Sequence, residues 1–169
     1  MSLKQDELQI ADISDNEMPF EQFLTYRLLA LTSRLSRQAI KIIESRHDLR
    51  LPEWRCLAMI GRHSVLHANR ISEIAGMDRG LVSRAIQGPL PKGYALVERD
   101  KDDKRIVRVT LTKGGCALYE EMLPVMQQRQ KRLLSALSPK DRKAVDRIIE
   151  RLTQSLDEWE DEWGNNAAG

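Results

Sequence analysis

Apolar residues recur at a helical period in the segment that follows Pro19. Their successive spacings are four, four, three, four, four and three residues, which places them on one face of a helix. The members are Phe20, Leu24, Leu28, Leu31, Leu35, Ala39 and Ile42. Such a helix leaves more apolar surface than a small domain covers, so we expect residues 18–47 to form an N-terminal dimerisation helix.

A second stripe of this kind lies in the C-terminal segment. Ser138 and Pro139 supply a capping residue and a proline at the first helical position. The stripe ends in two tryptophans four residues apart, and large aromatic side chains are enriched at protein interfaces. We therefore expect dimerisation helices over 113–164. The side chains predicted at the dimer interface are Phe20, Leu24, Leu152, Leu156, Trp159 and Trp163.

Two shorter helices are predicted next to the first long one. Pro52 in a first helical turn, with Glu53 beside it, starts a helix that continues to about Arg62. The following helix covers 68–75, and Gly76 ends it.

A third short helix covers 79–87. Asp78 precedes it, so its carboxylate can accept hydrogen bonds from the free amides of the first turn. The helix stops at Gly88 and Pro89, because glycine permits a left-handed terminal residue and proline cannot continue the hydrogen-bond ladder. Residues 94–99 and 106–111 then alternate as two strands joined by a charged turn.

These elements predict a mainly α fold with a small two-stranded β-wing, a winged helix-turn-helix, over residues 48–112. On a helix-turn-helix template, Ser72, Gly76 and Val82 occupy the small, corner and buried aliphatic positions. Five residues of the second helix of the motif are then expected on its solvent-exposed face. They are Arg79, Gly80, Ser83, Arg84 and Gln87.

Arginine and glutamine can form paired hydrogen bonds to guanine and adenine, whereas serine and backbone amides can hold phosphates. The helix alone would be ordinary solvated surface; the hairpin beside it favours a DNA-binding site. In the hairpin tip Asp103 could orient Arg105 toward an A·T-rich minor groove. Lys101 and Lys104 add positive charge there. The connector QGPLPKGYALV implies an early helix stop and a short wing.

Three segments resemble the MarR (multiple-antibiotic-resistance regulator) family of winged helix-turn-helix transcription factors: MDRGLVSRAI, LVERD and DKRIVRVTLTKGG. The resemblance covers 19–163. It implies a homodimer whose terminal helices intertwine, with two recognition helices over a palindromic operator. It also implies that Ser83 and Arg84 read the major groove and that Asp103 and Arg105 serve the wing. Family members usually repress transcription and release DNA on binding a small anionic or phenolic ligand or on oxidation of a cysteine.

Composition changes this interpretation little. The formal net charge is only +2, but basic residues gather between positions 79 and 108, which is typical of a specific DNA reader. We expect a flexible arm over 1–17 and a flexible tail over 165–169. No run is apolar enough for a membrane span, and the N-terminus does not resemble a signal peptide, so we expect a cytoplasmic protein.

Other chemistry has weak support in the sequence. Cys56 and Cys116 form no CxxC motif, and Cys56 lies on the apolar side of its helix, so we expect reduced thiols. His63 and His67 have the spacing of a helical metal site, but no third ligand follows, and we expect loop histidines and no metal or cofactor. No catalytic motif is present, so we expect no enzyme. Two alternatives remain open: a winged-helix protein-interaction adaptor without specific DNA reading, and a cysteine-based redox sensor.

Overall fold

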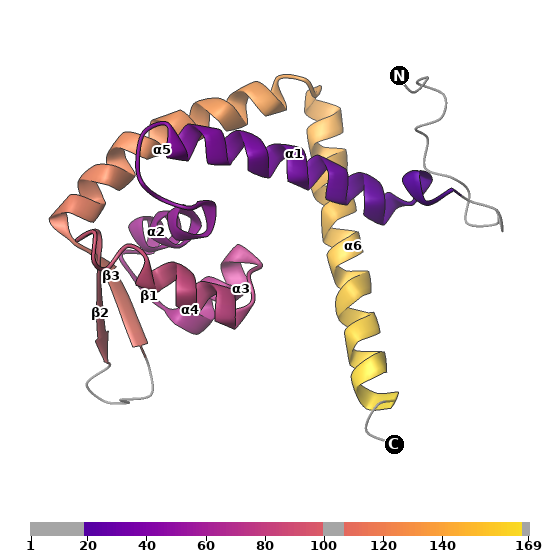
Figure 1. Cartoon of the computed structure of the whole chain (residues 1–169). Coiled ribbons are helices and arrows are strands. Elements are labelled where there is room, and N and C mark those ends of the chain that lie inside the picture. The colour runs from indigo at the N-terminus through magenta and orange to yellow at the C-terminus, as the bar shows by residue number, and fades with distance from the viewer. Residues whose placement is uncertain (1–18, 100–106, 167–169) are drawn as a thin grey trace. The chain divides into compact units, whose positions relative to one another are not determined.

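The computed structural model describes residues 19–99 and 107–166. The chain divides into two compact units, Met1–Tyr119 and Glu120–Gly169, so that the boundary falls inside helix α5 (Lys113–Leu134). Figure 1 identifies the elements, and each unit is described by itself.

The first long helix begins later than its apolar stripe predicts. Phe20–Gln22 form a single 3-10 turn, η2, and Phe23 is extended, so α1 spans Leu24–Glu44 and Phe20 lies outside it. The break brings three aromatic rings together, with centroid distances of 5.2 Å between Phe20 and Phe23 and 5.9 Å between Phe20 and Tyr26. Ring contacts of this kind favour the turn over a continuous helix.

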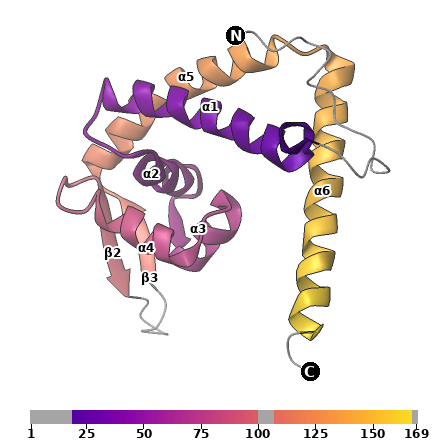
Figure 2. The same cartoon turned by 45° about the vertical axis from the view of Figure 1, so that its right-hand side comes forward.

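Three helices build the centre of the first unit: α2 (Leu51–His63), α3 (Ala68–Ala75) and α4 (Arg79–Gln87). They lie together beside the strands (Figure 2). The bounds of α3 and α4 match those that the sequence predicts, and α2 matches within one residue. The core of the unit consists of fully buried aliphatic side chains, including Ile43, Leu57, Ile60, Ile71, Val82 and Val109.

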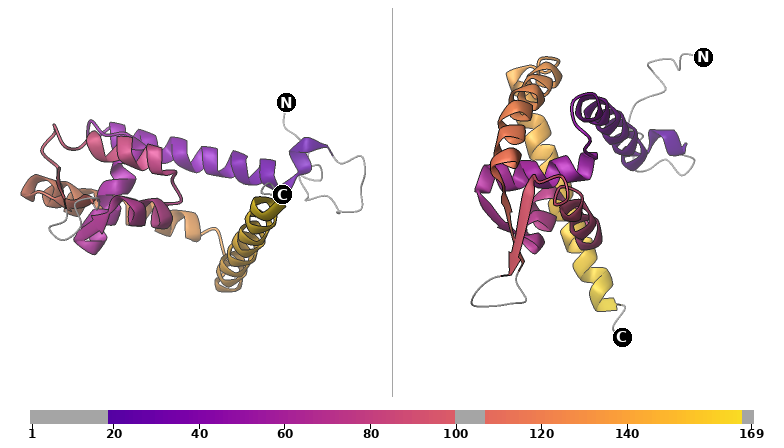
Figure 3. Two further views of the ribbon diagram at one scale, coloured as in Figure 1. Left: turned by 90° about the horizontal axis from the view of Figure 1, so that it is seen from below. Right: turned by 60° about the vertical axis from the view of Figure 1, so that its left-hand side comes forward.

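The sheet has three strands, one more than the sequence predicts. Strands β2 (Ala95–Arg99) and β3 (Val107–Leu111) form the expected antiparallel hairpin, which extends from the helices in Figure 3. Strand β1 (Val65–His67) adds to the free side of β3, with Leu66 opposite Val109, giving the order β1-β3-β2. The segment expected as a loop is therefore a strand, because its backbone groups find partners in β3. His63 ends α2 and His67 ends β1, so neither histidine lies in a loop.

Gly88 ends α4 for a reason different from the predicted one. Its backbone is right-handed helical, with φ −59° and ψ −47°, so no left-handed residue closes the helix. A side chain at Gly88 would instead collide with the carboxylate of Glu53, which lies at the N-terminus of α2. The close approach of the Glu53 side chain, and not backbone handedness, therefore favours glycine at this position.

The second unit contains the end of α5 and the helix α6 (Pro139–Asn166). Ser138 caps α6: its hydroxyl accepts a hydrogen bond from the amide of Asp141 at 3.2 Å and donates one to the Asp141 carboxylate at 2.6 Å. The guanidinium of Arg142 closes the corner by donating to the carbonyl of Leu134. No helix in the described part of the chain has the length and apolar character required to cross a bilayer.

Candidate nucleic-acid interface

The corner between α3 and α4 is held by local bonds. Gly76 takes the left-handed conformation, with φ 58° and ψ 39°, which glycine adopts without a steric penalty. The hydroxyl of Ser72 donates to the Met77 carbonyl at 2.5 Å, and the Met77 amide donates to the Ser72 carbonyl at 3.2 Å. Val82, 1% exposed, packs beneath. These contacts fix the direction in which α4 leaves the corner.

Asp78 occupies the N-cap of α4. Its Oδ1 accepts a hydrogen bond from the amide of Leu81 at 2.8 Å, which satisfies one of the free donors of the first turn. Arg84 lies close to this cap: a Cβ built on Gly80 would be 3.2 Å from Asp78 Oδ1 and 3.4 Å from Arg84 Nη1. The guanidinium therefore lies back over Gly80, along the exposed first turn of the helix.

The outer face of α4 carries the predicted contact positions together. Arg79, Gly80, Ser83, Arg84 and Gln87 are all exposed, whereas Val82, Ala85 and Ile86 are buried on the opposite face. One side of this short helix therefore anchors it and the other presents two guanidinium groups, a hydroxyl and an amide to solvent. This set can donate to phosphates and to base edges.

The hairpin lies beside this face. A groove of about 400 Å³ separates α4 from the strands, and Ser83 and Gln87 line it on the helix side. Val97 and Val107 line it on the strand side, together with Arg99. The sequence analysis missed this contribution of the strands to the site. The alternation of the hairpin residues indicated which of them face outward but not which helix they face.

The tip of the hairpin lies outside the described residues. Lys101, Asp103, Lys104 and Arg105 all belong to the 100–106 segment, so their predicted roles stay predictions. The strands that lead to the tip carry Glu98 opposite Arg108 in the register of β2 and β3, an opposite-charge pairing that favours this register.

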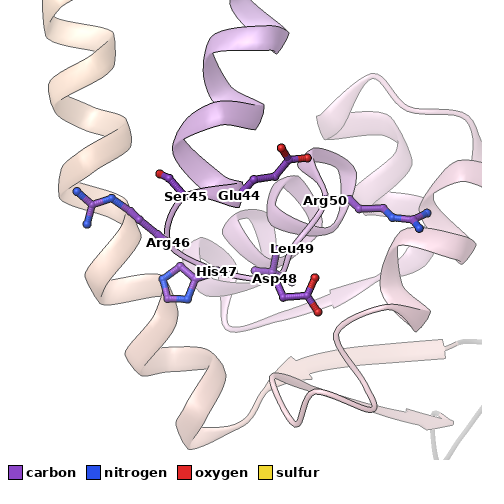
Figure 4. Close-up of a pocket in the computed structure, with 7 residues that line it drawn as sticks. All are labelled: Glu44, Ser45, Arg46, His47, Asp48, Leu49 and Arg50. Atoms are coloured by element: carbon purple, nitrogen blue, oxygen red, sulfur yellow. The ribbon is translucent and has the colours of Figure 1, made fainter.

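A second concave feature lies at the corner between α1 and α2. Residues Glu44 to Arg50 line a cavity of about 470 Å³, shown in Figure 4. The guanidinium groups of Arg46 and Arg50 point in opposite directions there, so they do not converge on one ligand. In the first unit, the Tyr119 ring stacks on Trp54 with a centroid distance of 6.5 Å.

The cysteines differ in environment. Cys56 is 1% exposed, and burial, with a smaller contribution from the Glu53 carboxylate, raises the pKa of its thiol from 9.0 to about 11. Cys116 is exposed on α5. A thiol that is buried and protonated at neutral pH is a poor nucleophile, so Cys56 has the properties of a core side chain. Among the described residues, no group of three or more histidine, cysteine or acidic side chains could hold a metal ion.

Comparison with known proteins identifies the fold. No family model matches the sequence. The MarR/EmrR-family regulator of Acinetobacter sp. ADP1 superposes with a TM-score of 0.77 at 23% identity, over 83% of this chain and 99% of that one. The chain has the MarR fold.

Other proteins with the MarR fold extend the comparison. MepR of S. aureus, in complex with DNA, has a TM-score of 0.72 at 19% identity, over 78% of this chain and 96% of that one. BpsR of Bordetella bronchiseptica, solved in a study of the regulation of its DNA binding by 6-hydroxynicotinic acid, has a TM-score of 0.72 at 22% identity, over 82% and 98% of the two chains. The HTH-type transcriptional regulator YwaE of Bacillus subtilis (strain 168) is 20% identical over 147 residues, which are 83% of this chain and 85% of that protein.

Proposed function

We propose that the protein is a sequence-specific DNA-binding transcriptional regulator of the MarR family. The observation that carries the proposal is the exposed face of α4, where Arg79, Ser83, Arg84 and Gln87 are displayed from a helix anchored on its other side. The likeness to MepR, which was crystallised with DNA, supports the same function. The proposal includes no catalytic activity.

In this proposal, different parts of the site make different contacts with DNA. α4 enters the major groove, where Arg84 and Gln87 pair with base edges and Ser83 holds a phosphate. The hairpin follows the backbone toward the minor groove, and the tip arginine, Arg105, enters it. Arg84 lies over Gly80 near the Asp78 cap, so the cap carboxylate helps to direct its guanidinium before DNA arrives.

The proposal also includes a homodimer. Several apolar side chains of η2, α1 and α6 are exposed in the single chain: Phe20 is 65% exposed, Leu31 50%, Leu156 55% and Trp159 60%. Leu24 and Leu152 are half-buried, and the side chain of Trp163 lies outside the described part of the structure. A twofold dimer that covers these residues would present two α4 helices about one DNA turn apart, and its operator would be an inverted repeat.

We place the protein among repressors that a small-molecule effector releases from DNA in the cytoplasm. The likeness to BpsR, whose DNA binding 6-hydroxynicotinic acid regulates, supports this part of the proposal. The effector would shift the population of dimers toward a spacing of the two α4 helices that no longer matches the operator.

The test is selection from a pool of random DNA duplexes at two salt concentrations, followed by sequencing. We expect an inverted repeat, and an affinity that falls steeply as salt rises because phosphate contacts release counterions. Arg84→Ala and Gln87→Ala should each cost about 1–3 kcal/mol and relax the preference at one base pair in each half-site. Weak binding without sequence preference would refute the regulator and favour the adaptor.

The dimer has a separate test. Replacing Leu156 and Trp159 together by glutamate should convert the dimer to a monomer in sedimentation velocity experiments, because two buried charges without partners oppose association. Glu158→Gln, which changes an exposed polar side chain of the same helix, is the matched control. A double variant that remains dimeric would show that these side chains are not at the interface.

A further inference from the structure

A lysine joins the connector between α4 and β2 to the corner between α1 and α2. The ammonium of Lys92 donates a hydrogen bond to the backbone carbonyl of Asp48, in the corner between α1 and α2. It also lies 3.3 Å from the Asp48 carboxylate and 3.7 Å from the Glu53 carboxylate. The Lys92 side chain is only 28% exposed. A lysine on a connector usually extends into solvent, whereas the Lys92 side chain is partly covered by the residues that it contacts.

Glu53 connects the same cluster to the end of α4. The residue is buried, 8% exposed, and Oε2 accepts a hydrogen bond from the Arg50 amide at 2.8 Å, which caps α2. The other oxygen, Oε1, lies against the backbone of Gly88, where no Cβ would fit. Gly88 is the first residue after α4. The carboxylate therefore contacts the end of the recognition helix and faces the lysine that follows it on the connector.

The far end of the connector is also fixed. The hydroxyl of Thr112 donates to the Gly93 carbonyl at 2.6 Å, and the Thr112 amide donates to the Tyr94 carbonyl at 3.1 Å. The connector is also held by the fully buried Pro89, whose carbonyl accepts a hydrogen bond from the Tyr94 amide at 3.0 Å. The cluster of Lys92, Asp48 and Glu53 adds a further restraint on residues 88–92. Loss of the lysine charge would remove this restraint next to the end of α4.

We propose that Lys92 is a positioning residue for DNA recognition: by joining Asp48 and Glu53 it fixes the C-terminal end of α4, and with it Arg84 and Gln87, without contacting DNA. The inference rests on the proposed function and adds to it a residue that the sequence analysis did not single out. The Lys92 ammonium is directed at two carboxylates, that of the buried Glu53 and that of Asp48, whose side chain is 99% exposed.

A direct contact between Lys92 and a DNA phosphate is the competing explanation, and the two make opposite predictions. If Lys92 contacts phosphate, Glu53→Gln removes a competing negative charge and strengthens DNA binding. If Lys92 positions α4, Glu53→Gln weakens binding, although the protein becomes more positive. The amide oxygen of glutamine can still accept from the Arg50 amide, so the cap of α2 is retained.

The experiment measures affinity for the selected inverted repeat over a range of salt concentrations. We expect Lys92→Met to weaken binding about tenfold and Glu53→Gln by a smaller factor. The salt dependence should keep the wild-type slope, because no phosphate contact is lost. Lys92→Arg should restore most of the affinity. Arg46→Met, which removes an exposed cation from the same corner, is the matched control and should change affinity less than twofold. A slope reduced by about one for Lys92→Met, with tighter binding for Glu53→Gln, would overturn the proposal.

A second measurement separates this inference from the proposed function. Hydrogen exchange of the free protein should be faster at the amides of Ile86, Gln87 and Gly88 in Lys92→Met and in Glu53→Gln than in wild type or Arg46→Met. Unchanged exchange at these amides would overturn the positioning role, whatever the DNA result. If the wild-type protein selects no sequence but the exchange differs as expected, the regulator proposal fails and the role of Lys92 in fixing α4 stands.

Discussion

The ring of Tyr119 occupies the space in which a side chain at Gly61 would lie. A Cβ built on Gly61 would be 2.6 Å from Tyr119 Cγ and within 2.9 Å of both neighbouring ring carbons. The ring also stacks on Trp54, with an interplanar angle of 26°. α2 and the first turns of α5 therefore meet through an aromatic ring that fits only because residue 61 has no side chain.

Gly61→Ala should destabilise the protein by about 1–3 kcal/mol, because the ring cannot move aside without disturbing Trp54. The midpoint of urea unfolding measures the effect. Gly114→Ala is the matched control: its new Cβ would meet neighbours no closer than 3.5 Å, and alanine favours a helix, so it should be neutral or stabilising. Equal stability of the two variants would contradict the packing argument.

Removing the cap of α4 should also lower stability. Asp78→Ala deletes the acceptor for the Leu81 amide and should cost about 0.5–2 kcal/mol in thermal or urea unfolding. Asp78→Asn keeps an acceptor oxygen and should lose much less. If both variants lose the same amount, the charge of Asp78 and not its hydrogen bond supports the helix.

Alkaline pH should destabilise the fold through Cys56. The pKa of the Cys56 thiol is about 11 in the folded protein, above the ordinary value of 9.0, so the unfolded chain releases the thiol proton first as pH rises. The contribution to stability is therefore complete below pH 9 and is lost as pH rises toward 11. Cys56→Ala removes this contribution, so its unfolding free energy should fall less steeply over that range than that of wild type. Identical slopes would show that Cys56 does not titrate as its burial indicates.

The same burial predicts the pattern of thiol labelling. In native protein at neutral pH, iodoacetamide should modify the exposed Cys116 and leave Cys56 unmodified, as mass spectrometry can measure. Unfolding should expose both thiols. Rapid native labelling of Cys56 would contradict its burial and would support the redox-sensor alternative through this residue.

Ser64 stores backbone strain that glycine should relieve. It follows α2 with φ 66° and ψ −44°, and it is the one residue other than glycine with positive φ among the described residues. Ser64→Gly should stabilise the protein by about 1 kcal/mol. This is the strain energy that glycine relieves, reduced by the greater conformational entropy that glycine gives the unfolded chain. Ser64→Ala keeps the Cβ and should bring no gain. The free energy of urea unfolding of both variants tests this prediction. If Ser64→Ala also stabilises the protein, the serine hydroxyl and not the backbone conformation is the source of the instability.

Local signals explain which parts of the fold the sequence predicted. The bounds of α3 and α4 were predictable because Gly76 and Asp78 act within a few residues of the helix ends they define. The hairpin was predictable from its alternation, and the fold class is confirmed. Strand β1 was not predictable, because Val65–His67 is too short for a pattern and depends on pairing with β3, far along the chain.

The candidate site divides in the same way. The outward face of α4 follows from helical geometry once Val82 is taken as buried, so its exposed residues could be named from the sequence. The contact between Glu53 and Gly88 could not, because it joins the start of one helix to the end of another. The sequence did contain a partial signal, since Glu53 follows Pro52 in a first helical turn, but nothing indicated that Lys92 would approach it.

The third strand alters how the hairpin can behave. Strand β3 lies between β1 and β2, and β1 leads directly into α3 at Ala68. The hairpin is therefore connected to the start of the helix-turn-helix through one pair of strands. Backbone hydrogen bonds therefore join the hairpin, through β3, to the strand that leads into α3. A displacement of β3 would act through its hydrogen bonds to β1 on the residues that begin α3, so that the strands and the helix-turn-helix are mechanically coupled.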